Sequence, residues 1–371
     1  MPTAISGTAG VTIGSGAAYT FGDGSTQTSA ADPADFGFKN RIINGAMVID
    51  QRNAGASVTV TGGSGYYSCD RWQQWMSQNS KYSIQRSTTA PVGFINSLLA
   101  TSLSAYSVVA ADSFALNQNI EGLNIADLAW GTANAATVTL SFWVRSSLTG
   151  TFGGAISNSA VNRSYPFTYT ISAANTFEYK TITIAGDTSG TWLTDNGIGI
   201  RLWFSIGAGS TYLGTAGAWA GADYRGATGQ TSVVGTNGAT FYITGVQLEK
   251  NTGATGFDVR PYGTELALCQ RYCFVPASSS RYVGQCDATT RALIIYVFPQ
   301  TMRSGPNATL ASAATYNVTT AAGGTVAGTS VSLSGGFTDT AQVAISVASG
   351  LVAGNASLVT ASGTTIFSAE L

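Results

Sequence analysis

Histidine is absent from the 371-residue chain, and its absence excludes several classes of enzyme. Nucleophile systems of the Ser-His-Asp and Cys-His kinds need an imidazole base, and most zinc sites need imidazole ligands. The remaining route to catalysis is a carboxylate pair of the glycosidase kind. The 18 acidic residues are scattered, and several lie in turn-like segments, where acids usually act as turn formers or caps. We therefore predict that the chain is not an enzyme; a polysaccharide-cleaving protein is the alternative, with Asp223 as the acid to test first.

Charged side chains are equally scarce. They make up 9% of the residues, with a net charge of -1, whereas soluble domains typically carry about 25%. No cluster of Lys or Arg could offset the phosphate charge of a nucleic acid. The longest apolar run, residues 292–298, is far shorter than the roughly 20 residues that span a bilayer. We expect neither a nucleic-acid partner nor membrane insertion.

Cysteines are few, and a secretion signal is not apparent. The four cysteines do not form a disulfide framework in a chain of this size, so we expect buried free thiols, with a Cys269–Cys273 bridge as the alternative. The first basic residue is Lys39, which leaves no charged start for a signal peptide and predicts synthesis in a reducing cytoplasm. Asp23-Gly24-Ser25 is too short for a calcium loop of the EF-hand type, and we predict no metal and no cofactor.

The residues that are abundant favour strands. Thr, Val, Tyr, Phe and Trp are frequent, whereas the chain has only 4 Lys and 5 Glu to support long helices. Apolar and polar side chains alternate in residues 137–145 and 198–206, which indicates strands with one buried face. Further strands are expected at residues 166–171, 178–184 and 241–248. This pattern predicts an all-β chain whose residues 39–262 form a jelly-roll-like β-sandwich.

The flanks of the predicted sandwich differ from it in composition. Residues 1–38 are rich in Gly, Ser, Thr and Ala and could not close a core alone, which favours a virion-attachment or shaft segment, or else a disordered tail. Residues 263–274 read as a short helix with Thr264 as its N-cap and with Leu266, Cys269 and Cys273 on one apolar stripe. The remainder of 263–371 reads as a second, small β-domain, and its lack of charge favours burial between chains.

A long connection between two predicted strands is the first candidate site. Residues 207–238 exceed the roughly 12–15 residues above which structureless loops are uncommon and often functional. An aromatic ring can cover the apolar face of a sugar while a neighbouring polar group bonds its hydroxyls. The candidate ligand-binding residues of this loop are Tyr212, Trp219, Asp223, Tyr224 and Arg225. The alternative is that these side chains fasten the loop to its own sandwich or to a neighbouring subunit.

Two strands supply the second candidate site. Trp143 and Arg145 share one strand face, as do Arg201 and Trp203, and guanidinium stacking on indole suits a sugar platform or a contact between subunits. If the two strands are neighbours, a purely structural ladder is the favoured alternative. Opposite charges also lie close together at Asp50-Gln51-Arg52 and Asp70-Arg71-Trp72, where a buried ion pair is favoured over a ligand site.

Short motifs at both ends of the predicted sandwich form a set. They are Asn40-Arg41-Ile42-Ile43-Asn44-Gly45-Ala46-Met47, Asp50-Gln51-Arg52, Asp70-Arg71-Trp72, Ile243-Thr244-Gly245-Val246-Gln247-Leu248-Glu249 and Arg260-Pro261-Tyr262-Gly263-Thr264-Glu265-Leu266-Ala267-Leu268-Cys269-Gln270-Arg271-Tyr272. This set resembles a phage tail-fibre domain family. Residues 302–306 and 366–371 are similar to C-terminal domains of tail fibres, and residues 19–28 resemble fibre-shaft segments, with Ser25 in place of the first Thr of the shaft motif.

The resemblance implies a fold, an assembly and a function. It implies a carbohydrate-module-like sandwich, a homotrimer, a place on the virion and attachment to a host surface glycan. The N-terminal segment, with Phe21, Gly22, Asp23 and Gly24 at its centre, would contact other virion proteins of the tail, baseplate or neck. A structural head, neck or decorating fibre without a receptor site is the alternative, because phages reuse such domains at several places.

Overall fold

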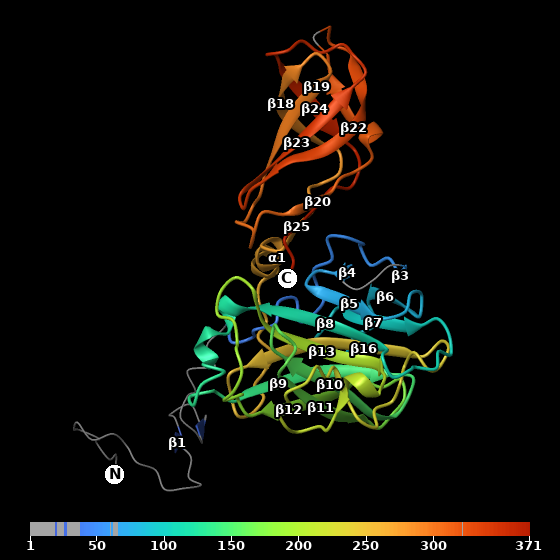
Figure 1. Ribbon diagram of the computed structural model, residues 1–371, viewed down its shortest axis with the longest axis vertical. Coiled ribbons are helices and arrows are strands. Elements are labelled where there is room, and N and C mark those ends of the chain that lie inside the picture. The colour runs from blue at the N-terminus through green and yellow to red at the C-terminus, as the bar shows by residue number, and fades with distance from the viewer. Residues whose placement is uncertain (1–18, 21–25, 28–37, 60, 62–65, 321) are drawn as a thin grey trace, which may run out of the picture.

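The computed structural model describes residues 19–20, 26–27, 38–59, 61, 66–320 and 322–371. Figure 1 shows two β-rich bodies, a sandwich and a smaller barrel, with helix α1 and the C-terminal end of the chain between them. The prediction of an all-β chain is confirmed, since strands dominate both bodies. Near the N-terminus, β1 (Tyr19–Thr20) pairs with β2 (Thr26–Gln27). The expected attachment residues Phe21, Gly22, Asp23 and Gly24 lie outside the described residues.

The sandwich consists of two six-stranded antiparallel sheets. Sheet I has the order β11-β10-β13-β8-β5-β4, and sheet II has the order β12-β9-β16-β7-β6-β3. The strands of sheet I are β4 (Tyr66–Cys69), β5 (Trp72–Met76), β8 (Ser113–Glu121), β10 (Gly150–Ser157), β11 (Ser164–Ile171) and β13 (Ile198–Ala208). The strands of sheet II are β3 (Val58–Thr59), β6 (Tyr82–Ser87), β7 (Ser97–Ser102), β9 (Val138–Ser146), β12 (Glu178–Ile184) and β16 (Thr240–Glu249). The chain therefore alternates between the sheets, for example from β8 to β9 to β10.

The period-2 alternation places the core of the sandwich between the sheets. The inward residues of β9 and β13 are all 0% exposed: Val138, Leu140, Phe142, Val144, Ile200, Leu202, Phe204 and Ile206. The rings of Phe142 and Phe204 meet edge to face at 5.0 Å, so the two sheets pack directly on each other. Ile198, which the same alternation placed inward, is only half-buried because the β13–β8 register shifts between Ile198 and Ile200.

The predicted helix is shorter than expected. α1 runs from Tyr262 to Gln270, and it begins after Pro261 with no side-chain cap, so the predicted Thr264 cap was wrong. Cys273 lies outside the helix, in β17 (Cys273–Phe274), because its backbone pairs with Ser368 of β25 (Ile366–Ser368). β25 also pairs with β20 (Asn307–Thr309), and these three strands form a small sheet between sandwich and barrel.

The C-terminal body is a closed barrel, a closure that the sequence did not predict. Its strand order is β18-β19-β23-β22-β21-β24. The strands are β18 (Ser280–Ala288), β19 (Arg291–Val297), β21 (Tyr316–Thr319), β22 (Thr325–Gly336), β23 (Thr340–Val347) and β24 (Ala356–Ala361). A separate apolar core fills it, so the barrel does not depend on the sandwich for its interior. On its outer face, Val283, Ile295 and Leu358 are 78%, 54% and 36% exposed.

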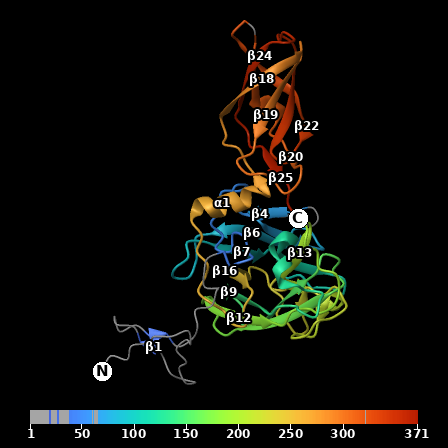
Figure 2. The same cartoon turned by 90° about the vertical axis from the view of Figure 1, so that its left-hand side faces the viewer.

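A group of contacts that we term the clamp fastens the barrel to the sandwich. Glu370 forms ion pairs with Arg52, at 3.0 Å, and with Arg71 of the turn between β4 and β5. Leu371 O accepts hydrogen bonds from Asn119 Nδ2 at 2.9 Å and Tyr67 Oη at 3.2 Å. Figure 2 shows α1 lying across the end of the sandwich beneath the barrel. The charges of the two motifs are thus members of buried ion pairs, as favoured, but Arg52 and Arg71 share a partner, Glu370, that comes from the far end of the chain.

The cysteines behave as predicted. Cys69, Cys269, Cys273 and Cys286 are all free and buried. Burial raises the pKa of the Cys69, Cys269 and Cys273 thiols well above the ordinary value. These three side chains therefore remain protonated packing residues at neutral pH.

Candidate functional site

Sheet register aligns polar and aromatic side chains on the outer face of sheet I. Gln73 of β5 pairs with Asn117 of β8, which in turn pairs with Trp203 of β13. Because directly paired residues project to the same face, these three side chains form one row across the sheet. Trp75 lies two residues after Gln73 and meets Trp203 edge to face at 5.4 Å. Asn119 and Arg201 form the neighbouring row.

The long loop predicted at residues 207–238 folds onto this face. The loop contains the 3-10 turn η4 (Ser210–Tyr212) and the parallel pair β14 (Leu213–Gly214) and β15 (Gly226–Ala227). The guanidinium carbon of Arg225 lies 4.3, 4.5 and 5.2 Å from the ring centres of Tyr212, Trp75 and Trp203. Asp223 holds this guanidinium with two hydrogen bonds of 2.6 and 3.1 Å.

We call this assembly the platform. It consists of Gln73, Trp75, Asn117, Asn119, Arg201, Trp203, Tyr212, Asp223 and Arg225. The structure thus joins five of the nine predicted binding residues, which come from two separate sequence segments, at one surface. Trp203 is only 1% exposed, so it supports Arg225 and Trp75 from below rather than facing solvent. Trp75, Arg201, Tyr212 and Asp223 are the half-exposed members.

Several buried polar atoms of the platform lack a hydrogen-bond partner. They are Gln73 Oε1, Asn117 Oδ1 and Arg201 Nε. Gln73 is 9% exposed and Asn117 is 0% exposed, so open solvent does not hydrate these side chains freely. A buried polar group without a partner costs about 1–3 kcal/mol, and native proteins usually satisfy such groups with water or a ligand. Gln73 Oε1 and Asn117 Oδ1 can accept hydrogen bonds and Arg201 Nε can donate one, but all three atoms are buried, so a bound hydroxyl group reaches them only after the side chains shift.

Two further predicted residues of the loop lie away from the platform. The Trp219 indole donates a 2.8 Å hydrogen bond to Ala185 O and packs edge to face against Trp130, Trp192 and Tyr165. This packing matches the alternative in which the aromatic residue fastens the loop to its own sandwich. A Cβ atom built on Gly214 would lie 2.3 Å from the ring of Tyr224, so Tyr224 covers β14.

Trp143 and Arg145 lie on the opposite side of the sandwich from Arg201 and Trp203. β9 belongs to sheet II and β13 to sheet I, so the two strands are not neighbours, and the condition under which a single ladder was favoured is not met. Trp143 instead packs against Tyr179 at 5.4 Å, and Arg145 lies over the ring of Tyr242 at 5.0 Å. The described residues around Trp143 do not form a row of unpaired polar atoms like that of the platform, although Arg145 Nε is also unpaired.

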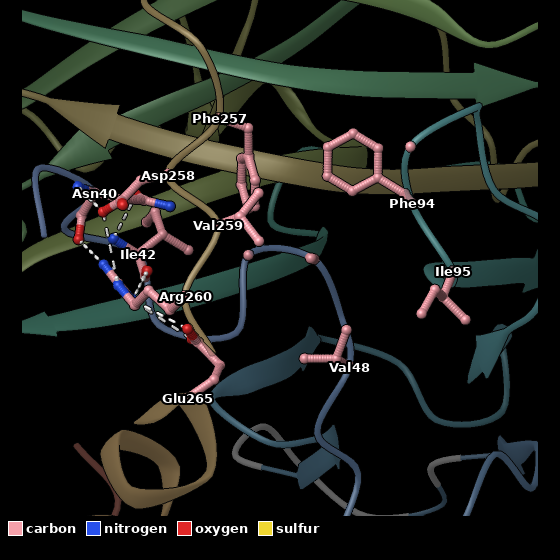
Figure 3. A pocket seen from close by; sticks show the side chains of 13 residues that line it. Asn40, Ile42, Val48, Phe94, Ile95, Phe257, Asp258, Val259, Arg260 and Glu265 are labelled. Atoms are coloured by element: carbon pink, nitrogen blue, oxygen red, sulfur yellow. Dashed lines mark hydrogen bonds and ion pairs between the residues drawn. The ribbon is translucent and has the colours of Figure 1, made fainter. Parts of the chain in front are cut away.

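A pocket of about 150 Å³ lies near helix α1 (Figure 3). Phe94 and Phe257 form its apolar wall and meet edge to face at 5.1 Å, while Ile95 and Val259 stand exposed at its rim. On one side, the Arg260 guanidinium lies between Asn40 and Glu265 in Figure 3. Asn40 belongs to the motif at the start of the sandwich, and Arg260 and Glu265 belong to the motif at its end. The two motifs are therefore in contact in the folded chain.

Arg260 shows why these motifs are structural. Its Nη1 donates to Ile42 O at 3.1 Å and lies 3.4 Å from Glu265 Oε2, while Nη2 donates to Asn40 O. The Arg260–Glu265 pair is therefore a buried ion pair that joins the start of the sandwich to helix α1, the reading favoured for such charges over a ligand site.

Sequence reasoning missed four platform residues. Gln73, Trp75, Asn117 and Asn119 were not predicted, although one signal was available. Trp72 and Met76 are buried in the core, so the alternation in Trp72-Gln73-Gln74-Trp75-Met76 would place Gln73 and Trp75 together on the other face. No sequence signal linked these residues to β8, because that depends on the pairing of strands about 40 residues apart.

The part of the chain that the structure describes has neither a metal-binding cluster nor a membrane-spanning helix. No group of three or more Cys, Asp or Glu side chains is placed there to hold a metal ion. None of the helices within the same residues is long and apolar enough to cross a bilayer.

Comparison with known proteins gives only distant structural likenesses. No protein-family model and no curated protein matches the sequence. A tailspike enzymatically active domain of bacteriophage CBA120 is 11% identical with a TM-score of 0.34, and the match covers 57% of this chain and 21% of that one. This chain thus spans about a fifth of the length of the tailspike structure.

Two further likenesses span the whole length of the solved chains that they match. A putative sugar binding protein from Bacteroides thetaiotaomicron is 13% identical with a TM-score of 0.34, covering 57% of this chain and 100% of the other. A family 11 carbohydrate-binding module from Clostridium thermocellum is 9% identical with a TM-score of 0.27, covering 54% and 100%. At such scores the function has to be inferred from the residues of the chain itself.

Proposed function

We propose that this chain is a virion fibre protein that attaches to a host surface polysaccharide through the platform. The observation that carries the proposal is the row of unpaired polar atoms, Gln73 Oε1 and Asn117 Oδ1, beside the half-exposed ring of Trp75. A sugar ring offers hydroxyl donors to such acceptors and an apolar face to an indole. The virion assignment rests on the motifs that resemble tail-fibre domains.

Binding without hydrolysis is the favoured activity. Glycosidases use two carboxyl groups about 5–10 Å apart, one of them commonly with a raised pKa. Asp223 is the only acid among the platform residues, and the Arg225 guanidinium engages both of its oxygens. The enzymatic alternative therefore has no residue pair to support it at this surface.

Attachment through weak sites would gain from several copies. The resemblance predicts a homotrimer, in which three sites on one fibre would raise the overall affinity without new contacts. The exposed apolar row Val283, Ile295 and Leu358 on the barrel supports a contact between copies, because isolated domains rarely leave such neighbours uncovered. The N-terminal segment would join this fibre to the particle.

The purified full chain tests the proposal on an array of bacterial capsular and cell-wall polysaccharides. We expect Trp75→Ala to weaken binding about tenfold, because the variant loses the ring on which a sugar can lie. Trp143→Ala, on the outer face of sheet II, is the matched control and should bind as the unaltered chain does. Thermal unfolding of both variants shows whether the sandwich is intact.

Two outcomes would contradict this assignment. If the unaltered chain binds no polysaccharide and does not compete with particles for host cells, the fibre has a structural or decorating role. That role is the second candidate, and it is favoured by the covering of Trp203 by the chain's own loop. If Trp143→Ala abolishes binding while Trp75→Ala does not, the site lies on sheet II.

A further inference from the structure

Arg201 is a partly buried cation of the platform that forms no ion pair with any of the described residues. Its strongest hydrogen bonds are long, 3.4 Å from Nη1 to Asn119 Oδ1 and 3.4 Å from Nη2 to Ser159 O, and Nε has no partner. Ordinary N–H···O bonds measure about 2.7–3.2 Å, so the guanidinium is held loosely by dipoles alone. No carboxylate of the described residues lies within ion-pair distance of it.

Other arginines of the sandwich show what is unusual here. Arg225 is neutralised by Asp223 and stacked on aromatic rings, and Arg163 is held by Asp187 at 2.7 Å. Arg145 also lacks an ion pair, but it lies over the ring of Tyr242. Arg201 has neither an acid nor a ring against its guanidinium among the residues with described positions. Its charge is therefore available to a ligand.

Burial and a neighbouring cation destabilise the charged form of the Arg201 guanidinium when no ligand is bound. Burial and the neighbouring Arg225 guanidinium lower the pKa of Arg201, and Asp223, which lies beyond ion-pair distance, offsets this only in part. The platform carries two guanidinium groups and one carboxylate, so it bears one excess positive charge. A ligand that supplied an oxyanion would relieve both the desolvation and the repulsion.

We infer that the platform selects an acidic saccharide, whose oxyanion binds the loosely held Nη groups of the half-exposed Arg201 while its ring lies on Trp75. This inference rests on the proposed function and narrows it to a class of ligand. The oxyanion can be a uronate-type carboxylate or a phosphodiester in the polysaccharide chain, and both fit the planar fork of a guanidinium. After a shift of their side chains, Gln73 Oε1 and Asn117 Oδ1 would accept hydrogen bonds from the hydroxyl groups of the same sugar.

Binding to paired polymers tests the inference. The full chain is titrated with polygalacturonate, alginate, hyaluronate and colominic acid, each beside its carboxyl-reduced form, and with polyglycerol phosphate and dextran. We expect at least one acidic polymer to bind about tenfold or more tightly than its neutral counterpart, with the preference falling as salt rises. A preference for polyglycerol phosphate over all the carboxylates identifies the oxyanion as a phosphodiester.

Variants separate this charge from the rest of the site. Arg201→Gln should abolish the preference for the acidic form, and Arg201→Lys should keep only part of it because an ammonium lacks the planar fork. Arg281→Gln, which removes an exposed arginine from barrel strand β18, is the matched control and should preserve the preference. Since Arg201 makes only long hydrogen bonds, its variants should unfold at nearly the temperature of the unaltered chain.

The possible failures are distinguishable. Equal binding of acidic and neutral forms, with loss in Trp75→Ala, overturns the acidic selectivity and leaves the glycan-binding function standing. An acidic preference that persists in Arg201→Gln also overturns the inference, because another cation must then read the charge. If no polymer of this set or of the polysaccharide array binds, both the function and the inference fail.

Discussion

Asp70 lies in the turn after β4 and is 0% exposed. Its carboxylate accepts hydrogen bonds from Gln51 Nε2 at 2.5 Å and Gln51 N at 3.3 Å, and Arg52 Nη1 lies 4.0 Å away. Burial raises the pKa of Asp70 to about 6, although Arg52 and Gln51 act in the opposite direction. Because of this one residue, the stability of the clamp region varies with pH in the mildly acidic range.

The sign of this dependence follows from proton binding. The unfolded chain has an ordinary aspartate pKa of 3.8, so between pH 4 and 6 the folded state binds the proton more tightly. The contribution of Asp70 to the free energy of unfolding therefore falls as the pH rises through this range. Urea unfolding gives the free energy of unfolding of the unaltered chain and of Asp70→Asn at each pH. We expect the value for the unaltered chain minus the value for the variant to be about 1 kcal/mol larger at pH 5 than at pH 7. An equal difference at both pH values would show that Asp70 ionises normally.

At the scale of elements, Glu121 connects the end of β8 to the segment after helix α1. Its carboxylate accepts hydrogen bonds from Arg271 Nε at 2.9 Å, Arg271 Nη2 at 2.5 Å and Tyr272 Oη at 2.5 Å. Burial acts to raise the pKa of Glu121, but the hydrogen bonds from Arg271 and Tyr272 outweigh it, so the pKa lies below the ordinary value. The contact holds the two residues between the end of the helix and β17 against sheet I.

Glu121→Gln tests this connection. The variant keeps the shape of the side chain and loses its charge, so we expect it to lower the free energy of unfolding by about 2 kcal/mol at pH 7. Because the folded pKa is depressed, the stabilisation is present above the ordinary pKa of 4.5 and is lost as the pH falls below it. Urea unfolding at pH 7 and pH 3.5 measures both effects. Arg291→Gln, which breaks the exposed Asp287–Arg291 pair of the barrel, is the control and should change stability little.

Helix α1 illustrates how neighbouring elements override a local pattern. The sequence periodicity favoured a helix to residue 274, but Ser368 and Phe367 of β25 pair with Cys273 and Phe274 and draw them into a strand. Tertiary pairing thus ended the helix four residues early, at Gln270. A propensity of a few tenths of a kcal/mol per residue is easily outweighed by such pairing.

At the scale of the whole molecule, Glu370 is the acid that neutralises two buried cations. Arg71 is 1% exposed, and the side chains of Arg52 and Glu370 are 7% and 6% exposed. Removing one partner of a buried ion pair leaves an uncompensated charge, at a cost of roughly 3–5 kcal/mol. Arg303 adds hydrogen bonds of 2.8 Å to the carbonyl oxygens of Ala369 and Glu370.

Glu370→Gln should therefore loosen the barrel from the sandwich. Because each body has its own core, we expect the two to stay folded while the connection near residues 275–279 becomes sensitive to protease. Limited proteolysis and the radius of gyration in solution measure this change. Glu178→Gln, in a pair with Lys180 on the sandwich surface, is the control. A protease pattern identical to that of the unaltered chain would show that β17–β25 pairing alone holds the bodies together.

Much of the sandwich could be predicted from local order. The alternation of apolar and polar residues in β9 and β13 predicts which side chains face the core, because successive side chains on a strand point to opposite sides. The strand at residues 178–184 coincides with β12. The long loop was also recognisable as a candidate site, since its length and its aromatic and charged residues are local properties.

Nonlocal contacts could not be predicted in the same way. The assignment of β9 and β13 to different sheets, the closure of the barrel and the contact of Glu370 with Arg52 and Arg71 each join segments far apart in the chain. The same holds for the approach of Arg225 to Trp75, which unites a loop with a strand 150 residues earlier.

The sequence by itself determined the all-β character, the free thiols and the absence of histidine chemistry, because these depend on residue types and on their local period. Only the tertiary structure decided which polar side chains share a face and which arginines receive a carboxylate. Strand register and loop docking place those groups within a few ångströms of one another, and neither is encoded in any single segment. The candidate site is for this reason a property of the assembled sheet I rather than of a motif.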